Sequence, residues 1–166
     1  MNQQEKVEYL RELAGRRPDL RIFIETGLYG RRGSGTSLTD RFDWLYAIDL
    51  DPDNCEHAEG YTRAVCGDSA VELPRLLARL TDPALFWLDA HLLVEYDDED
   101  ACPLIAELQA IVAWPEAHRS IIAIDDIRLL SDRASGYPTL DEVRAVVAGV
   151  GWIEEAGDDV FAFVSR

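Results

Sequence analysis

Acidic residues end four apolar segments of this sequence, and together they could carry one chemical task. Glu25 closes RIFIE, Asp49 closes WLYAID, Asp89 closes LFWLD, and Asp125 and Asp126 close IIAIDD. Short apolar runs of this kind are typical of parallel strands that are buried on both faces. Because parallel strands end at the same edge of a sheet, where such sheets bind ligands, we expect these carboxylates to lie together. We therefore look for the functional site at this edge.

Alternating strands and helices would bring the acids to that edge. Periodicity predicts strands at Leu20–Glu25, Trp44–Asp49, Thr62–Cys66, Ala84–Asp89 and Ser120–Asp125, and helices at Glu5–Ala14, Pro52–Gly60, Ala70–Leu80, Ala101–Trp114 and Thr139–Ala148. Asp51 and Asp100 are the expected N-caps of the second and fourth helices. Two apolar runs on either side of residues 156–159 predict a closing hairpin. This order predicts an α/β fold with a doubly wound, mostly parallel sheet and one antiparallel strand at its edge.

The composition narrows the class of protein and of ligand. With 166 residues the chain is expected to form one domain, residues 1–166, in which residues 1–18 supply a helix packed on the sheet. A formal net charge of -16 disfavours nucleic acid and favours a small, neutral or cationic ligand. No apolar run is long enough to span a membrane and the first residues are polar, so we expect a cytoplasmic location. Three cysteines without CxxC spacing indicate neither a disulfide framework nor structural zinc.

The glycine turn after the first expected strand has two interpretations. Gly27–Gly30 does not match GxGxxG, and Glu25 would repel a phosphate but favour an ammonium or sulfonium group. The turn could instead contain glycines only to relieve steric strain. Asp49, about 20 residues further on, stands where a carboxylate accepts ribose hydroxyls, and the polar turn Gly67–Ser69 could bind the edge of an adenine. Together these signals predict an adenosine site with a positive tail.

At this point the residues resemble the class I S-adenosylmethionine-dependent methyltransferases, most closely the small-molecule O-methyltransferases of the catechol and macrolide-sugar types. The similar segments are ETGLYG (Glu25–Gly30, first motif), AIDLDP (Ala47–Pro52, ribose-binding motif), GDS (Gly67–Ser69, adenine-binding turn) and FWLDAH (Phe86–His91, fourth-strand motif). The resemblance spans about Leu20 to Arg166. It implies a Rossmann-like sheet of seven strands in which the C-terminal hairpin contributes the antiparallel strand.

The resemblance also implies which residues bind S-adenosylmethionine. The implied cofactor-binding residues are Glu25, Thr26, Gly27, Tyr29, Thr36, Asp49, Gly67, Asp68, Ser69 and Asp89. The segment GRRGSGTSL is a few residues longer than the usual first loop. It therefore stays open whether Gly33, Gly35 or Thr36 lies next to the methionine portion.

In the metal-dependent branch of that family, acids after the fourth and fifth strands bind Mg²⁺, and Asp89, Asp125 and Asp126 fall on the matching positions. Oxygen ligands suit this ion, and a bound acceptor hydroxyl would lose its proton more easily. Alternatively, Asp125 or Asp126 caps the next segment. His91, two residues after Asp89, is the candidate general base, with a cofactor contact or a structural hydrogen bond as alternatives.

The resulting functional hypothesis is a methyltransferase of the EC 2.1.1 type that methylates a hydroxyl of a small molecule with the help of Mg²⁺. One alternative is a metal-independent enzyme that methylates nitrogen or carboxylate, in which the acids bind a cationic acceptor. Another is a non-catalytic adenosine-binding partner subunit. A nicotinamide-binding protein is disfavoured by Glu25 and by the broken glycine pattern. Because little sequence is left for a lid, a homo-oligomer in which a second copy completes the acceptor site is also considered.

Overall fold

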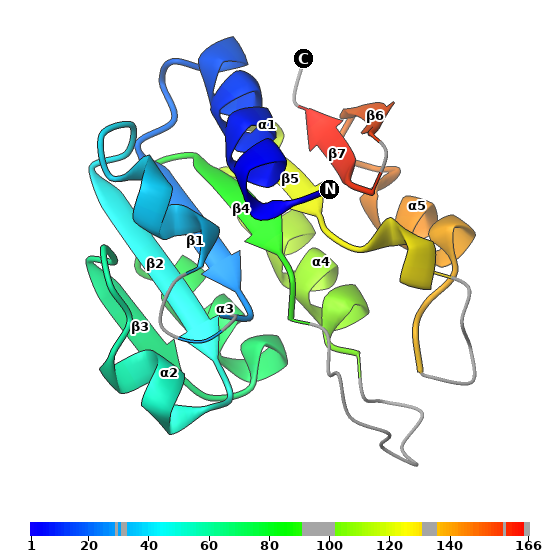
Figure 1. Ribbon diagram of the computed structural model, residues 1–166. Coiled ribbons are helices and arrows are strands. Elements are labelled where there is room, and N and C mark those ends of the chain that lie inside the picture. The colour runs from blue at the N-terminus through cyan, green and yellow to red at the C-terminus, as the bar shows by residue number, and fades with distance from the viewer. Residues whose placement is uncertain (29, 31–32, 91–101, 131–135, 158, 165–166) are drawn as a thin grey trace.

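The computed structural model describes residues 1–28, 30, 33–90, 102–130, 136–157 and 159–164. Its centre is a seven-stranded sheet with the order β3-β2-β1-β4-β5-β7-β6 (Figure 1). The strands are β1 Ile22–Thr26, β2 Trp44–Asp49, β3 Arg63–Cys66, β4 Ala84–Leu88, β5 Ile121–Ile124, β6 Ile153–Ala156 and β7 Phe161–Val164. The first five strands pair in parallel, and β7 is antiparallel to both of its neighbours. The predicted α/β fold, with its mostly parallel seven-stranded sheet and antiparallel C-terminal hairpin strand, is confirmed.

The position of the antiparallel strand corrects one expectation. β7 lies between β5 and β6 rather than at the edge, so that Val164 pairs with Ile121 on one side and with Ile153 on the other. Every residue of β7 is buried, whereas three of the four residues of β6 are exposed. A strand that is apolar throughout needs neighbours on both sides, while a strand with exposed acidic side chains tolerates the edge.

Helices cover both faces of the sheet. They are α1 Gln3–Arg16, α2 Pro52–Glu56, α3 Ser69–Leu77, α4 Leu104–Ala113 and α5 Leu140–Val147, with short 3₁₀ turns η1 Ser34–Leu38, η2 Ala117–Arg119 and η3 Ile127–Leu129. Residues of α1 and η1 pack in one apolar cluster, and those of α3, α4 and α5 pack in a second cluster on the opposite face (Figure 1). Among the described residues, none of the helices combines the length and the apolar character that a membrane crossing requires.

Local signals explain where several helices begin. Asn2 and Glu5 form a capping box at the start of α1, and Asp51 caps α2 as predicted. The predicted cap Asp100 lies outside the described residues, and α4 begins at Leu104 after Pro103 in the cap position. The fourth helix is therefore shorter than its apolar pattern indicates.

Alternation along the strands decides which face the acids share. Three expected acids follow a core residue beneath α1 by two positions: Glu25 after Phe23, Asp89 after Trp87 and Asp125 after Ala123. Successive strand side chains point to opposite faces, so these acids continue the α1 side of the sheet. The carboxyl edge therefore carries its acids beneath and beside α1.

Candidate active site

Gly27 joins the ends of β1 and β4. It has a left-handed backbone with φ +80, and a Cβ atom there would lie 2.4 Å from the carbonyl oxygen of Asp89. Its amide donates to the carbonyl of Ile48 at 2.9 Å. Only glycine fits this position, which supports the steric interpretation of the turn. Gly27 therefore serves the packing of β1 against the end of β4, and its own N–H is already bonded within the sheet.

Glu25 anchors the loop that follows β1. Its carboxylate is 1% exposed and accepts from the amides of Ser34 at 2.8 Å and Gly35 at 3.0 Å, and from the hydroxyl of Tyr61. Burial raises the pKa of Glu25 to about 7, and the charge of Asp89 adds to this, although the three hydrogen bonds oppose it. Burial and the Glu25 charge also raise the pKa of Tyr61 above its usual range. Glu25 thus holds the backbone of this loop in place, and its buried side chain is not accessible to a ligand.

The loop residues that pack on this anchor are glycines. A Cβ atom at Gly33 would lie 2.3 Å from the Tyr61 hydroxyl, and one at Gly35 would lie 2.6 Å from the Tyr61 ring. The Thr36 hydroxyl instead donates to the carbonyl of Glu59 at 2.9 Å. Gly33, Gly35 and Thr36 were the three residues considered for the place next to the methionine portion. Gly33 and Gly35 lie against Glu25, whereas Thr36 contacts the segment before Tyr61.

Asp49 ends β2 with a half-buried, oriented carboxylate. One oxygen accepts from the Leu28 amide, and the other accepts from the Asp51 amide at 2.7 Å and from the Asn54 side chain at 3.2 Å. All three donors are neutral, so the bonds orient the carboxylate without cancelling its charge. Asp49 and the glycine turn, which lie about 20 residues apart in sequence, are in direct contact here.

The GDS turn lies against the same residue. The Gly67 amide donates to the carbonyl of Asp49 at 2.9 Å, and Asp68 caps α3 through the Ala70 amide at 2.9 Å. Ser69 is the buried first residue of α3. The structure therefore brings together the predicted ribose-binding acid, the glycine turn and the predicted adenine-binding turn.

A second cluster of acids lies beyond β5 and before β7. Carboxylate oxygens of Asp125, Asp126 and Asp159 all lie within 4.8 Å of one another. The fully buried Asp125 accepts from the Lys6 ammonium and from the Asp126 amide at 2.8 Å. Arg128 bonds Asp126 at 2.9 Å and also bonds Asp159. This cluster is thus built from acids that already contact cations of the chain.

These contacts do not fit Mg²⁺. The close group contains Asp159 in the place of the predicted Asp89, and one oxygen of each acid is bonded to a cation, that of Asp125 to Lys6 and those of Asp126 and Asp159 to Arg128. Burial, and after it the charge of Asp89, raises the pKa of Asp125 to about 6, while Lys6 opposes the shift. Mg²⁺ binds through carboxylates whose charge is uncompensated and keeps several waters, whereas each acid of this group is already paired with a cation of the chain.

Several site residues were missed or lie outside the described part of the chain. Tyr29 and His91 are among the residues that the structure does not describe. Thr26 is fully buried, and its carbonyl accepts from the Asp89 amide at 2.9 Å. No sequence motif marks Lys6, Tyr61 or Asp159, although Tyr61 bonds Glu25, and Lys6 and Asp159 belong to the acidic group around Asp125.

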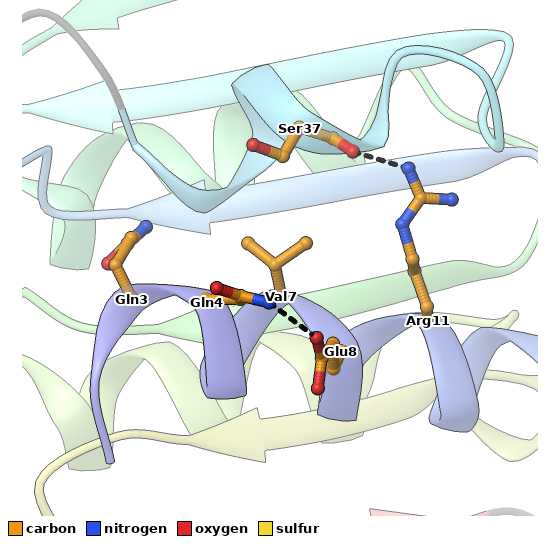
Figure 2. Close-up of a pocket in the computed structure, with 6 residues that line it drawn as sticks. All are labelled: Gln3, Gln4, Val7, Glu8, Arg11 and Ser37. Carbon is orange, nitrogen blue, oxygen red and sulfur yellow. Dashed lines mark hydrogen bonds between the residues drawn. The ribbon is translucent and has the colours of Figure 1, made fainter.

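A hollow of about 510 Å³ lies between α1 and η1 (Figure 2). It is lined by Gln3, Gln4, Val7, Glu8, Arg11 and Ser37. Gln3 donates to the Ser34 hydroxyl at 3.3 Å, and Arg11 donates to the Ser37 carbonyl at 2.7 Å. Since Gln3 and Arg11 bond the loop held by Glu25 from across the hollow, it is better explained as the contact between α1 and this loop.

No family model matches this sequence, and no curated protein matches it. Solved structures with a similar fold include a TehB-like S-adenosylmethionine-dependent methyltransferase from Corynebacterium glutamicum, with 17% identity, TM-score 0.60 and coverage of 95% of this chain and 86% of the other. The sugar N-methyltransferase KedS8 from Streptoalloteichus has 12% identity, TM-score 0.67 and coverage of 99% and 88%. An O-methyltransferase from Bacillus cereus in complex with S-adenosylhomocysteine has 14% identity, TM-score 0.58 and coverage of 97% and 81%. At these identities the likeness shows the Rossmann-like methyltransferase fold.

Proposed function

We propose that this chain is an S-adenosylmethionine-dependent methyltransferase that acts on a small molecule. The observation that carries the proposal is the placement of Asp49, whose charged carboxylate ends β2 against the Leu28 amide. In doubly wound sheets this is the edge where a carboxylate binds the ribose of an adenosine ligand. The fold shared with methyltransferases of several kinds supports the same function.

The described residues fit this cofactor. Asp49 would hold the ribose hydroxyls, the turn Gly67–Ser69 would hold the adenine, and Gly27 lets the backbone after β1 pack closely against that of Asp89, which brings the two strand ends together. Bound there, the cofactor would supply a methyl group activated by a sulfonium. Glu25 would act indirectly, because it holds the amides of Ser34 and Gly35 in the loop that follows the glycine turn.

The remaining task of the chain is to position the acceptor and exclude water. An in-line attack on a methyl carbon gains mainly from orientation, so few catalytic side chains are required. The formal net charge of -16 favours a neutral or cationic acceptor. Asp89 stands at the end of β4 on the same edge, and His91, outside the described residues, stays the predicted general base.

We propose further that the transfer needs no divalent metal. Mg²⁺-assisted O-methylation is what the sequence resemblance implies, but each acid of the close group is already paired with Lys6 or Arg128. Without the metal, both a hydroxyl and an amine are suitable acceptors. Metal-independent methylation of nitrogen, one of the alternatives from the sequence, therefore stands beside O-methylation.

The test is a calorimetric titration of the purified chain with S-adenosylhomocysteine, with and without Mg²⁺, and with NADH as the control ligand. We expect micromolar binding of S-adenosylhomocysteine, equal in both buffers, and none of NADH. Absence of S-adenosylhomocysteine binding in both buffers would overturn the proposed function. Binding of NADH alone would replace it with a nicotinamide-binding function.

A further inference from the structure

Lys6 is the only lysine of the chain, since every other residue among its 16 lysines and arginines is an arginine. It lies near the start of α1, which crosses the sheet above β4 and β5 (Figure 1). Its ammonium bonds Asp125 and lies 5.9 Å from the centre of the Trp87 ring. The Lys6 side chain is only 16% exposed. A lysine so enclosed requires an anionic partner, and Asp125 is that partner.

The acids around Lys6 make this place strongly favourable for a cation. Burial alone would lower the pKa of Lys6, but the hydrogen bond and charge of Asp125, with the charges of Asp89 and Asp126, raise it. The ammonium therefore stays charged at neutral pH. The neighbouring cation, Arg128, bonds the other two acids of the close group, Asp126 and Asp159.

We propose that Lys6 is the resident cation on Asp125, the buried acid of this cluster, and there takes the place of a divalent metal beside the acceptor, while Arg128 and the N-terminal ammonium compensate the other acids. The first half of the proposal concerns the folded chain alone, and the second half rests on the proposed methyltransferase function. A metal ion entering here would displace Lys6 from Asp125 and would lie against two cationic side chains, which repel it. Lys6 is thus a positioning residue that acts through Asp125.

The placement of Lys6 is linked to the cofactor side of the molecule. The same helix contacts η1 through Gln3 and Arg11 (Figure 2). Ser34, which accepts from Gln3, also donates its amide to Glu25. Helix α1 therefore sets the position of the cation relative to the loop next to the cofactor.

The experiment is a titration with Mn²⁺, a paramagnetic substitute for Mg²⁺, followed by electron paramagnetic resonance of the free ion. It compares the wild-type chain, Lys6→Met, Lys6→Arg and the double variant Lys6→Met with Asp125→Asn. We expect no saturable site at the cluster in the wild type or in Lys6→Arg. Lys6→Met should bind Mn²⁺ at a saturable site, at least about ten-fold more tightly than the nonspecific binding of the wild type, because one repelling charge is gone. The double variant should lose that gain.

Two outcomes would overturn the proposal. One is a saturable Mn²⁺ site in the wild type that Asp125→Asn removes. The other is a folded Lys6→Met chain that gains no Mn²⁺ binding. If Lys6→Met does not fold, the wild type and Lys6→Arg still decide, because a saturable site in either that depends on Asp125 contradicts a resident lysine.

A titration of the same variants with S-adenosylhomocysteine separates this proposal from the proposed function. Failure of the wild type to bind it overturns the methyltransferase function and leaves the Mn²⁺ result to be judged alone. If an acceptor is identified, a chelator should leave wild-type turnover unchanged. Turnover of Lys6→Met should fall and be partly restored by added Mg²⁺, whereas a purely structural role would give no rescue by metal.

Discussion

The two halves of the carboxyl edge satisfy their carboxylates in different ways. In the cofactor half, formed by β1, β2 and β3, Glu25, Asp49 and Asp68 accept from backbone amides and neutral side chains. In the acceptor half, formed by β5 and β7, the acids bond Lys6 and Arg128. Neutral donors orient a carboxylate without compensating its negative charge, whereas a bonded cation compensates it. At the same edge of the sheet, the carboxylates of the cofactor half are therefore bonded to neutral donors, and those of the acceptor half are paired with cations.

The largest effect is expected from a substitution in the acceptor half. Asp125→Asn should lower the free energy of unfolding by about 3 kcal/mol, because it leaves the enclosed Lys6 ammonium without its anionic partner. Urea unfolding measures this. The control is Asp141→Asn, which removes an exposed ion pair with Arg144 and should change stability within the error of the measurement. Equal effects of the two variants would mean that Lys6 and Asp125 behave as a solvated pair.

The next largest effect is expected from a substitution in the cofactor half. Asp49→Ala should weaken S-adenosylhomocysteine binding about 100-fold, since a charged acceptor for ribose hydroxyls is lost. Asp51→Ala is the matched control, because Asp51 caps α2 two residues away, and it should change affinity less than about five-fold. Calorimetry measures both, and Asp125→Asn should retain wild-type affinity for the same ligand. A strong loss with Asp125→Asn would show that the two halves do not act separately.

Glu25 is a buried carboxyl group to which no cation is bonded in the described residues, and a pH series tests how this affects stability. Its pKa rises from 4.5 to about 7 on folding, so ionisation opposes folding and stability falls as pH increases between these values. Between about pH 5 and pH 8 the wild type should lose about 2 kcal/mol more unfolding free energy than Glu25→Gln. Tyr61 and Asp89 are the titratable groups that act on Glu25 and remain in both proteins. Parallel pH profiles for the two proteins would contradict the assignment.

The smallest effect concerns Tyr61, the neutral partner of Glu25. Tyr61→Phe should cost about 1 kcal/mol of stability, because one hydrogen bond to a buried carboxylate is lost while two amide donors stay. The same change should raise the pKa of Glu25 further, since the hydroxyl bond lowers it. A double-mutant cycle with Glu25→Gln measures the coupling, and purely additive effects would show that the bond contributes nothing.

Local patterns in the sequence were enough for most of the fold and for the cofactor half. The strand Trp44–Asp49, the cap at Asp51 and the helix starting after Thr139 follow from periodicity and capping rules that act over a few residues. The Asp49 placement also follows, because a strand end is defined by its own apolar run. These features depend on short stretches of chain.

The acceptor half could not be derived in the same way. Asp159 meets Asp125 only because β7 inserts between β5 and β6, and periodicity does not encode which strands become neighbours. Lys6 looks like an ordinary polar residue of an amphipathic helix, since nothing in a helical pattern gives the angle at which α1 crosses the sheet. Tyr61 stands between a helix predicted to end at Gly60 and the next predicted strand, and it reaches Glu25 across 36 positions of sequence. Each contact requires tertiary packing before it can be recognised.

The shared packing of α1 and β7 has a consequence for the order of events during synthesis. Leu10 and Leu13 of α1 lie in one apolar cluster with Ala162 and Val164 of β7. Because β7 follows all the other described strands along the chain, α1 leaves the ribosome long before this packing surface is complete. Until then its apolar face stays available to chaperones and to aggregation. Ribosome-bound chains arrested before Phe161 should accordingly be cleaved within α1 by protease, and chains released after Val164 should resist cleavage there.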